Sequence, residues 1–264
     1  MIALPLIRQA TALQYGEVLR EGHSHPCVMD CLDDYGEDRR LAVKFRSTVY
    51  GGNRALIAEL LASLLASALS IPVAAPFIVD CDASLGEAVA DAHIAKQIRE
   101  SAGFNFGSEF LQPARTVPPR WPLSGVYLDE ALKVFFLDAI IQNADRSELK
   151  PNLLVYRGGL IVIDHEQALP FMHGAVGREP WVANELTYLR NHIFYSGLRG
   201  KTLDFGEIAT LFVALDELRI QEHLNVIPKA WRLTNKDCQM YINYISTAQS
   251  KLSLIINNLN DFLR

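Results

Sequence analysis

Apolar and polar positions along the chain change their spacing near the middle, and the two patterns predict a β-rich first part and a helical second part. In the first part, short apolar runs alternate with turn signals such as Gly22 and the acidic loop 33–38, which is typical of strands. One long helix is predicted there at 54–69, where leucines recur at helical spacing until Pro72 follows. The strands are predicted at 15–21, 27–32, 40–46 and 76–80, with weaker patterns at 87–89 and 94–97.

The segment 106–122 separates the two parts, because it collects Gly107 and several prolines that interrupt regular structure. We therefore divide the chain into an amino-terminal lobe, residues 1–110, and a carboxy-terminal lobe, residues 111–264. The predicted fold class is α+β, with a β-rich first lobe and a helical second lobe. The second lobe is predicted to contain helices at 127–142, 181–196, 205–223 and 237–262, and a hairpin of strands 153–156 and 160–163 around Gly158 and Gly159.

Composition excludes several classes of function. The 264 residues are 50% hydrophobic and carry a formal net charge of −5 without a basic face, so charge does not suggest a nucleic-acid partner. The first residues lack the basic start and long apolar centre of a signal peptide, and no apolar run is long enough to span a membrane. Four cysteines are few for this length, as in proteins of a reducing compartment. We expect a cytoplasmic globular protein without a membrane partner.

Polar residues on either side of the predicted hairpin indicate a phosphoryl-transfer site. Asp145 precedes the hairpin, Asn152 begins it and Asp164 follows it, and the two ends of a hairpin lie side by side. Such a site needs a carboxylate near the acceptor hydroxyl, and carboxylate and amide oxygens for Mg²⁺. We expect Asp145 and Asp164 to face one another, with Asn152 close enough to share a metal with Asp164. Two carboxylates in one pocket repel each other, so without Mg²⁺ at least one should have a raised pKa.

The structural alternative is that Asp145 lies in a turn ending a helix and that Asp164 caps the hairpin. The order of two further charged residues along the chain favours the phosphoryl-transfer site. Lys44 ends a predicted strand, and Glu59 follows on the next predicted helix, as do the lysine and glutamate that pair in protein-kinase-like folds. The neighbours of Glu59 are largely apolar, so an unpaired charge there would be costly. We expect Lys44 and Glu59 to form an ion pair facing a cleft.

Several segments together resemble the HipA-like branch of the protein-kinase-like superfamily, in particular the short HipA-like kinases without an appended amino-terminal domain. This resemblance covers most of the chain. It implies a bilobal kinase fold and an ATP-dependent kinase whose acceptor is a protein serine or threonine. The motifs that carry it are GHSHP (22–26), LAVKF (41–45), AELLASLLASALSIPV (58–73), FNFGSEFL (104–111), NADRSELKPNLLV (143–155), LIVIDHEQAL (160–169) and IPKAW (227–231).

The resemblance also implies roles for individual residues. Lys44 would hold the α- and β-phosphates of ATP, Glu59 would orient Lys44, and Asp145 would be the catalytic base. Asn152 and Asp164 would bind Mg²⁺. Gly22 and Ser24 would belong to the phosphate loop, with Ser24 a candidate for autophosphorylation. The adenine would contact backbone groups of Gly107, Glu109, Phe110 and Leu111.

Lys150 departs from the kinase pattern. The usual catalytic loop carries its metal-binding asparagine five residues after the aspartate, where this chain has Lys150, and the asparagine comes at position 152. Lys150 could reach a phosphate in an active Mg-ATP-dependent kinase, or it could weaken the metal site of a nucleotide-binding regulatory module. A kinase of a small molecule is the third alternative. The expected partners are a protein substrate and, by the resemblance, a helix-turn-helix antitoxin.

Two further patterns are set aside. The sequence DFG at 204–206 has no strand before it, and Asp204 with Glu207 is instead predicted to form the N-cap and capping box of the following helix. Soft metal ligands also gather near the second predicted strand, but their spacing does not supply the chain reversal that a tetrahedral zinc site needs. These residues are His23, His25, Cys27 and Cys31.

Overall fold

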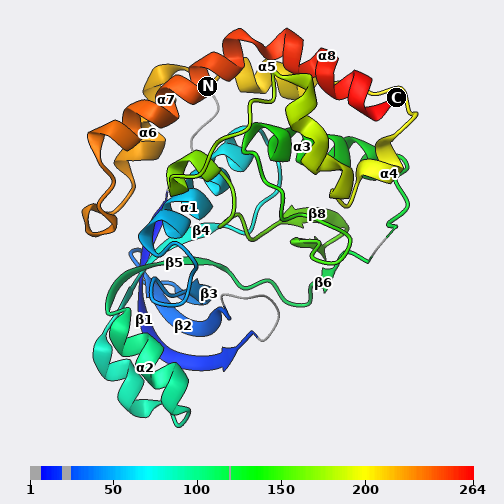
Figure 1. Ribbon diagram of the computed structural model, residues 1–264. Coiled ribbons are helices and arrows are strands. Elements are labelled where there is room, and N and C mark those ends of the chain that lie inside the picture. Colours follow the sequence, from blue (N-terminus) through cyan, green and yellow to red (C-terminus); the bar gives the residue numbers. More distant parts are fainter. Residues whose placement is uncertain (1–6, 20–24, 119) are drawn as a thin grey trace.

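The first five strands form a closed barrel. The computed structural model describes residues 7–19, 25–118 and 120–264. The strand order is β1-β2-β3-β5-β4, in which β1 runs parallel to β4 and the other neighbours are antiparallel. Figure 1 shows the barrel at one end of the molecule and the helices of the second half of the chain at the other. The strands are β1 (Arg8–Val18), β2 (Cys27–Asp33), β3 (Asp38–Lys44), β4 (Pro76–Cys81) and β5 (Gly103–Glu109).

Alternating apolar side chains fill the interior of the barrel. Met29 and Cys31 of β2 are buried while Asp30 between them is exposed, as the period of a strand requires. Leu41 and Val43 of β3 belong to the same buried cluster. The strands predicted at 27–32, 40–46 and 76–80 are therefore confirmed to within two residues.

The first predicted strand, 15–21, overlaps only the end of β1. This strand begins earlier, at Arg8, because its first residues pair with β4, which lies far away in the sequence. Nearly all of β1, from Ala10 to Val18, pairs with β2, its neighbour in the sequence, and the apolar pattern indicated only the last residues of this strand. A partner that is distant along the chain leaves no local signal.

The two weak strand predictions at 87–89 and 94–97 were wrong, because this part of the chain is helical. Asp82 and Asp91 each begin a helix by accepting hydrogen bonds from backbone N–H groups of its first turn. Ile94 and Ile98 then fall on one helical face and pack against the interior of the barrel. The helices are the 3₁₀ helix η1 (Ala83–Ala88) and α2 (Ala92–Glu100).

The segment predicted as the lobe boundary, 106–122, begins inside the barrel rather than beyond it. Its first residues belong to β5, which pairs with β3 on one side and β4 on the other. Gly107 lies in this strand at a place where a Cβ atom would come 2.5 Å from Cγ2 of Val79. The glycine that suggested a break therefore allows two strands to approach closely.

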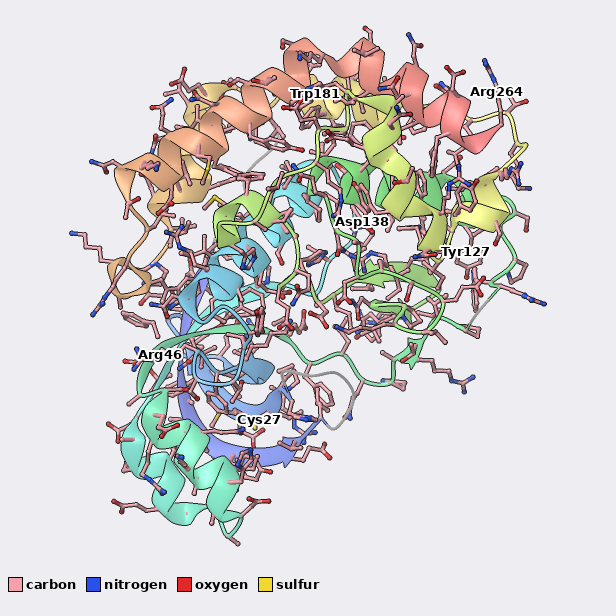
Figure 2. The ribbon with its side chains drawn as sticks, viewed as in Figure 1. Cys27, Arg46, Tyr127, Asp138, Trp181 and Arg264 are labelled. Carbon is pink, nitrogen blue, oxygen red and sulfur yellow. The ribbon has the colours of Figure 1, made fainter. Side chains whose placement is uncertain are left out.

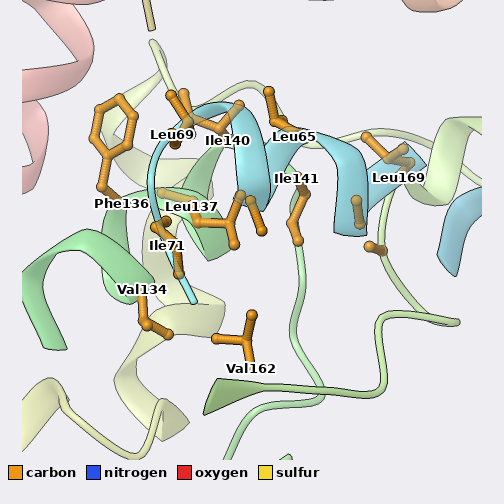
Figure 3. Packing of buried hydrophobic residues seen from close by; sticks show 14 of the residues in the cluster. Leu65, Leu69, Ile71, Val134, Phe136, Leu137, Ile140, Ile141, Val162 and Leu169 are labelled. Atoms are coloured by element: carbon orange, nitrogen blue, oxygen red, sulfur yellow. The ribbon is translucent and has the colours of Figure 1, made fainter. Parts of the chain in front are cut away.

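Helix α1 (Asn53–Ala68) lies between the barrel and the other helices and confirms the helix predicted at 54–69. It is buried on nearly all faces, because the barrel covers one side and the helical part of the chain covers the other. Figure 3 shows Leu65 of α1 in one cluster with Ile140 of helix α3 (Val126–Ile140) and Val162 of the hairpin. The core of the second part of the molecule is thus built around a helix from the first part.

The predicted hairpin is confirmed as β7 (Leu153–Tyr156) and β8 (Gly159–Val162). Its turn consists of Arg157 and Gly158, both with positive φ, so the turn lies one residue earlier than predicted. Gly159 is already paired with Tyr156. The strand β6 (Arg115–Thr116) adds to β7 and completes a small three-stranded sheet.

Of the helices predicted after the hairpin, the segment 181–196 is a 3₁₀ helix over Ala183–Asn191 followed by the start of a short α-helix, and the other two are interrupted. The segment 205–223 breaks at Asp216, whose side chain caps a new helix, and the segment 237–262 breaks at Lys251. Over the described ranges, no helix has both the length and the apolar character needed to cross a bilayer. The helical part comprises α3 (Val126–Ile140), η2 (Pro170–His173), η3 (Ala183–Asn191), α4 (Tyr195–Leu198), α5 (Gly206–Val213), α6 (Glu217–Asn225), η4 (Lys229–Trp231), α7 (Asn235–Ser250) and α8 (Leu252–Leu263).

The close approach at Gly107 gives a prediction for stability. Gly107→Ala should lower the free energy of unfolding by about 1–3 kcal/mol, because the new methyl group overlaps the Val79 side chain in a filled interior. Val79→Ala removes that overlap, so the double variant should lose less stability than the sum of the two single losses. Urea unfolding of the three variants measures this. Additive losses would contradict the proposed overlap.

Candidate active site

The ammonium group of Lys44 lies among three carboxylates. Lys44 Nζ is 2.7 Å from Oε2 of Glu59, 2.7 Å from Oδ1 of Asp164 and 3.2 Å from Oε2 of Glu166. Lys44 ends β3, Glu59 lies in α1, and the other two residues follow β8. The expected ion pair between Lys44 and Glu59 is confirmed, and the structure adds two partners from the second part of the chain.

The backbone around the hairpin holds these groups in place. Asp164 has a φ of 58°, in the left-handed region, so the chain turns sharply directly after β8. The next backbone N–H, of His165, donates a hydrogen bond of 2.9 Å to Oε2 of Glu59. Glu59 therefore bonds both to the lysine of the barrel and to the backbone beside Asp164, and it fixes the position of one relative to the other.

The charges in this cluster stabilise one another. Burial alone would lower the pKa of Lys44, but Glu59, Asp164 and Glu166 raise it far above its ordinary value. Burial would raise the pKa of Asp164, but the ammonium groups of Lys44 and Lys150 hold it well below its ordinary range. Burial would raise the pKa of Glu59 as well, but Lys44 and His165 together lower it. The three groups stay charged at neutral pH.

Glu166 is the member of this cluster that the sequence reasoning missed. Burial raises its pKa, and the neighbouring carboxylates of Asp164 and Glu59 add to the rise, while Lys44 opposes it. The sequence carries no clear signal for this contact, because Glu166 lies in a turn that follows the left-handed backbone at Asp164, and apolar periodicity does not predict such a turn.

Lys150 lies between the two aspartates on which the site was predicted. Its Nζ is 2.6 Å from Oδ2 of Asp145 and 3.3 Å from Oδ2 of Asp164. The two aspartates therefore share one cation, the Lys150 ammonium, and their carboxylates face the same site as expected. The pKa expected to be raised by their repulsion is instead lowered at Asp164, because two lysines neutralise that carboxylate. The expectation was wrong there, since it did not count the lysines.

Asn152 turns its amide group toward Asp145. Its Nδ2 donates to Oδ2 of Asp145 at 3.1 Å, and its backbone carbonyl accepts a hydrogen bond from the N–H of Ile163. The carboxylate of Asp145 thus receives hydrogen bonds from Asn152 and Lys150 and points into the site. These partners lie in the same loop as Asp145, and its role as the catalytic base stays a prediction. A metal shared by Asn152 and Asp164 stays a prediction.

A second buried ion pair holds the loop that carries Asp145. Arg146 Nε lies 2.5 Å from Oδ2 of Asp138, a residue of α3, and both side chains are fully buried. Arg146 also donates to the backbone carbonyls of Asn152, directly before β7, and Ile163, directly after β8. In Figure 2, Asp138 lies in the interior of the molecule. Because Arg146 connects the loop, the hairpin and α3, it fixes where Asp145 points.

Asp138 completes this network with neutral partners. Its carboxylate accepts from Asn143 Nδ2 at 3.0 Å and contacts Nε2 of His192 at 2.9 Å. Burial would raise the pKa of Asp138, but the Arg146 guanidinium lowers it far below its ordinary range. Sequence reasoning missed this network, because an aspartate on the buried face of an apolar helix gives no sign of which distant residue compensates it.

The structure describes only some of the other residues that were predicted to contact the nucleotide. The backbone N–H groups of Glu109 and Phe110 donate to the carbonyls of Ala75 and Arg40 at 2.9 Å each, so these two donors already have partners within the protein. The proposed contacts of Gly107 and Leu111 with adenine stay predictions. Gly22 and Ser24, assigned to the phosphate loop, lie outside the described residues.

The DFG segment at 204–206 lies at the start of a helix. Asp204 accepts a hydrogen bond from the N–H of Gly206, but the N-cap of α5 is Phe205, and Glu207 pairs with Lys133. The predicted capping box is therefore wrong, although Asp204 does bond to the first turn of the helix.

The cysteines near the second strand are buried thiols. Burial raises the pKa of both Cys27 and Cys31 to about 12, so neither is poised to bind a metal as a thiolate. His23 lies outside the described residues. In the described part of the chain, the group of candidate metal ligands that lies close together is Glu59, Asp164 and Glu166.

A strand lysine paired with a helix glutamate, beside two aspartates that flank a hairpin, is the set of groups that protein-kinase-like phosphotransferases use. A family model described as HipA-like kinase matches residues 19–262, nearly the whole chain. The chain therefore belongs to the HipA-like kinase family, as its sequence motifs suggested, and the family implies that it is a kinase. A search of curated proteins gave no match.

Glu59 and Glu166 should respond to pH in opposite directions. The lowered pKa of Glu59 contributes stability that is present above the pKa of an unfolded glutamate, about 4.3, and is lost as the pH falls. The pKa of Glu166 is raised, so the wild-type protein loses stability as the pH rises above the pKa of an unfolded glutamate. As the pH rises from 4 to 7, the stability of Glu59→Gln relative to wild type should therefore fall. Over the same range, the stability of Glu166→Gln relative to wild type should rise.

Urea unfolding of both variants across this pH range measures the two trends. At pH 7, Glu59→Gln should cost on the order of 3 kcal/mol, because it leaves a buried ammonium with fewer partners. Glu100→Gln, an exposed change on α2, is the matched control and should follow wild type at every pH. Parallel pH trends for the two buried glutamates would contradict the assignment of their charges.

Proposed function

We propose that this protein is an ATP-dependent kinase that transfers the γ-phosphoryl group to a serine or threonine hydroxyl of a protein. In this proposal, the barrel with α1 is the amino-terminal lobe, the remaining helices are the carboxy-terminal lobe, and the nucleotide lies between them. The observation that carries it is the contact of Lys44 with both Glu59 and Asp164. This contact brings a phosphate-binding cation from the barrel to a metal-binding carboxylate beside the hairpin.

The lysine is held ready for phosphate. Glu59 fixes the ammonium of Lys44 at 2.7 Å, and the side chains of both residues are almost fully buried. An ammonium in that setting stays charged and keeps one direction, which is what binding the α- and β-phosphates requires. The carboxylates of Asp164 and Glu166 neutralise Lys44 before the nucleotide arrives, and phosphate oxygens would replace part of that contact.

The oxygen donors of the site fit Mg²⁺. Asp164, which lies with Glu59 and Glu166 in one group of carboxylates, provides a carboxylate, and Asn152 provides an amide oxygen. Hard divalent cations prefer such ligands. When bound there, Mg²⁺ would supply positive charge to offset that of the phosphates of a nucleotide. Asp164 would hold the ion, since it lies next to the phosphate-binding lysine. Asn152 would be a second ligand through its amide oxygen.

Asp145 would act on the acceptor. Its carboxylate is aimed by Asn152 and Lys150, and its loop is anchored by the buried Arg146, so it can accept the proton of a positioned hydroxyl. The choice of a protein hydroxyl rests on the resemblance to HipA-like Ser/Thr kinases. The alternative, a catalytically weak module that binds nucleotide and regulates a partner, is favoured by one observation: the Lys150 ammonium lies against both aspartates.

Incubation with γ-³²P-labelled ATP and MgCl₂ tests the proposal directly. We expect label to transfer to the protein itself or to an added protein acceptor, and Mg-ATP to raise the melting temperature by mass action. Lys44→Met should abolish both effects, because it removes the cation that holds the phosphates. Lys133→Met removes a lysine whose partner, Glu207, lies on α5, and this control should keep both. A melting shift without any transfer would select the regulatory module instead.

Substitutions at the two aspartates should separate binding from turnover. Asp164→Asn should weaken Mg²⁺-dependent nucleotide binding, because the charge that faces the metal is lost. Asp145→Asn should leave nucleotide affinity nearly intact and lower kcat by about 10²–10⁴-fold, because the group that accepts the proton is lost. Calorimetric titration measures the first effect and steady-state phosphoryl transfer the second. Equal losses of affinity in both variants would overturn this division of roles.

A further inference from the structure

Lys150 occupies the place between the two aspartates where a metal-binding asparagine normally acts. The catalytic loop of protein kinases carries that asparagine five residues after the aspartate, and in this chain the fifth residue after Asp145 is Lys150. Its ammonium contacts the carboxylates of both Asp145 and Asp164, at 2.6 and 3.3 Å. The chain thus provides a cation where a kinase ordinarily provides a neutral ligand for a cation.

The loop fixes the direction of this lysine. The N–H of Lys150 donates to Oγ of Ser147 at 3.2 Å, and the carbonyl of Lys150 accepts from the N–H of Ser147 at 2.9 Å. Arg146, adjacent to Ser147, is anchored on Asp138 in the interior. The Lys150 side chain is about one quarter exposed, at 27%, so its ammonium reaches the site from the solvent side. The tight turn keeps it over the aspartates.

The balance of charge at Asp164 shows what this lysine replaces. Oδ1 of Asp164 contacts Lys44 at 2.7 Å and Oδ2 contacts Lys150, so each carboxylate oxygen already has an ammonium partner. The positive charge that a second divalent cation would bring is already present in the protein.

We propose, building on the proposed function, that Lys150 acts as an internal cation that takes the place of one divalent metal ion and contacts the terminal phosphates of the nucleotide. The triphosphate then meets two fixed ammonium groups, those of Lys44 and Lys150, even when no metal is bound. Mg²⁺ is needed at Asp164 alone. Nucleotide binding is therefore less dependent on metal than in a kinase with asparagine at this position.

Calorimetric titration with AMP-PNP, an ATP analogue that does not transfer its terminal phosphoryl group, tests this inference. Wild type is titrated in EDTA and again in MgCl₂, and its two affinities should lie within about tenfold of each other. In EDTA, Lys150→Asn should bind about tenfold to a hundredfold more weakly than wild type, because one charge-assisted contact to phosphate is lost. In MgCl₂ the same variant should recover to nearly wild-type affinity, since asparagine is the usual metal ligand there.

Two further variants separate charge from structure. Lys150→Arg keeps the positive charge and should retain metal-free binding, whereas a merely structural role of Lys150 would not be restored in this selective way. Lys133→Asn removes a lysine of similar exposure, 21%, that pairs with Glu207 at 2.8 Å, and it should leave both affinities unchanged. Circular dichroism of each variant checks that it is folded.

The outcomes distinguish this inference from the function on which it rests. Wild type that binds AMP-PNP only in MgCl₂, or Lys150→Asn that binds as well as wild type in EDTA, overturns the role of Lys150 and leaves the kinase proposal standing. Wild type that binds AMP-PNP under neither condition overturns both. Metal-free binding that depends on a positive charge at position 150 supports the inference.

Discussion

The ammonium of Lys44 contacts carboxylates from two regions of the chain that are about 105 residues apart in sequence, Glu59 in α1 and Asp164 with Glu166 after β8. A single buried cation with these partners is stable only while all of them stay in place, because a buried charge that loses its partner is strongly destabilising. The barrel, α1 and the hairpin are therefore held in one arrangement by one group. That same group is the one that the kinase proposal assigns to phosphate.

The packing of α1 makes this arrangement possible. Glu59 could not stay beside Lys44 if α1 moved away from the barrel, and α1 is fixed because its apolar residues enter the core of the helical part. Figure 3 shows that core, in which α1, α3 and the hairpin meet. Because α1 is closely packed on nearly all faces, it cannot shift without disturbing its neighbours. The ion pair at the site is thus supported by hydrophobic packing at a distance from it.

The pair of Asp138 and Arg146 has the same function for the other half of the site. Arg146 is fully buried and bonds to two backbone carbonyls as well as to the carboxylate, so its positive charge is compensated on several sides. It positions the loop from Asp145 to Lys150 over the hairpin.

Local pattern determined much of this protein. The sequence alone placed α1, α3 and the hairpin almost to the residue, because helical spacing of leucines and a glycine turn between apolar runs are short-range signals. It also selected Lys44, Glu59, Asp145 and Asp164 as site residues, since their order along the chain is that of the charged residues in protein-kinase-like folds. Their pairing by charge follows from elementary electrostatics once they share a site.

Only the tertiary structure decided which groups compensate one another. The start of β1, the pairing of β5 inside the barrel and the partners of Asp138 and Glu166 all depend on residues far away in the sequence. The positions of Lys44 and Lys150 beside Asp164 reverse the pKa shift expected at this carboxylate, because the sign of a shift depends on the nearest charges in space. Periodicity reports which face of an element is apolar, whereas the distance between charged atoms is set only when the chain has folded.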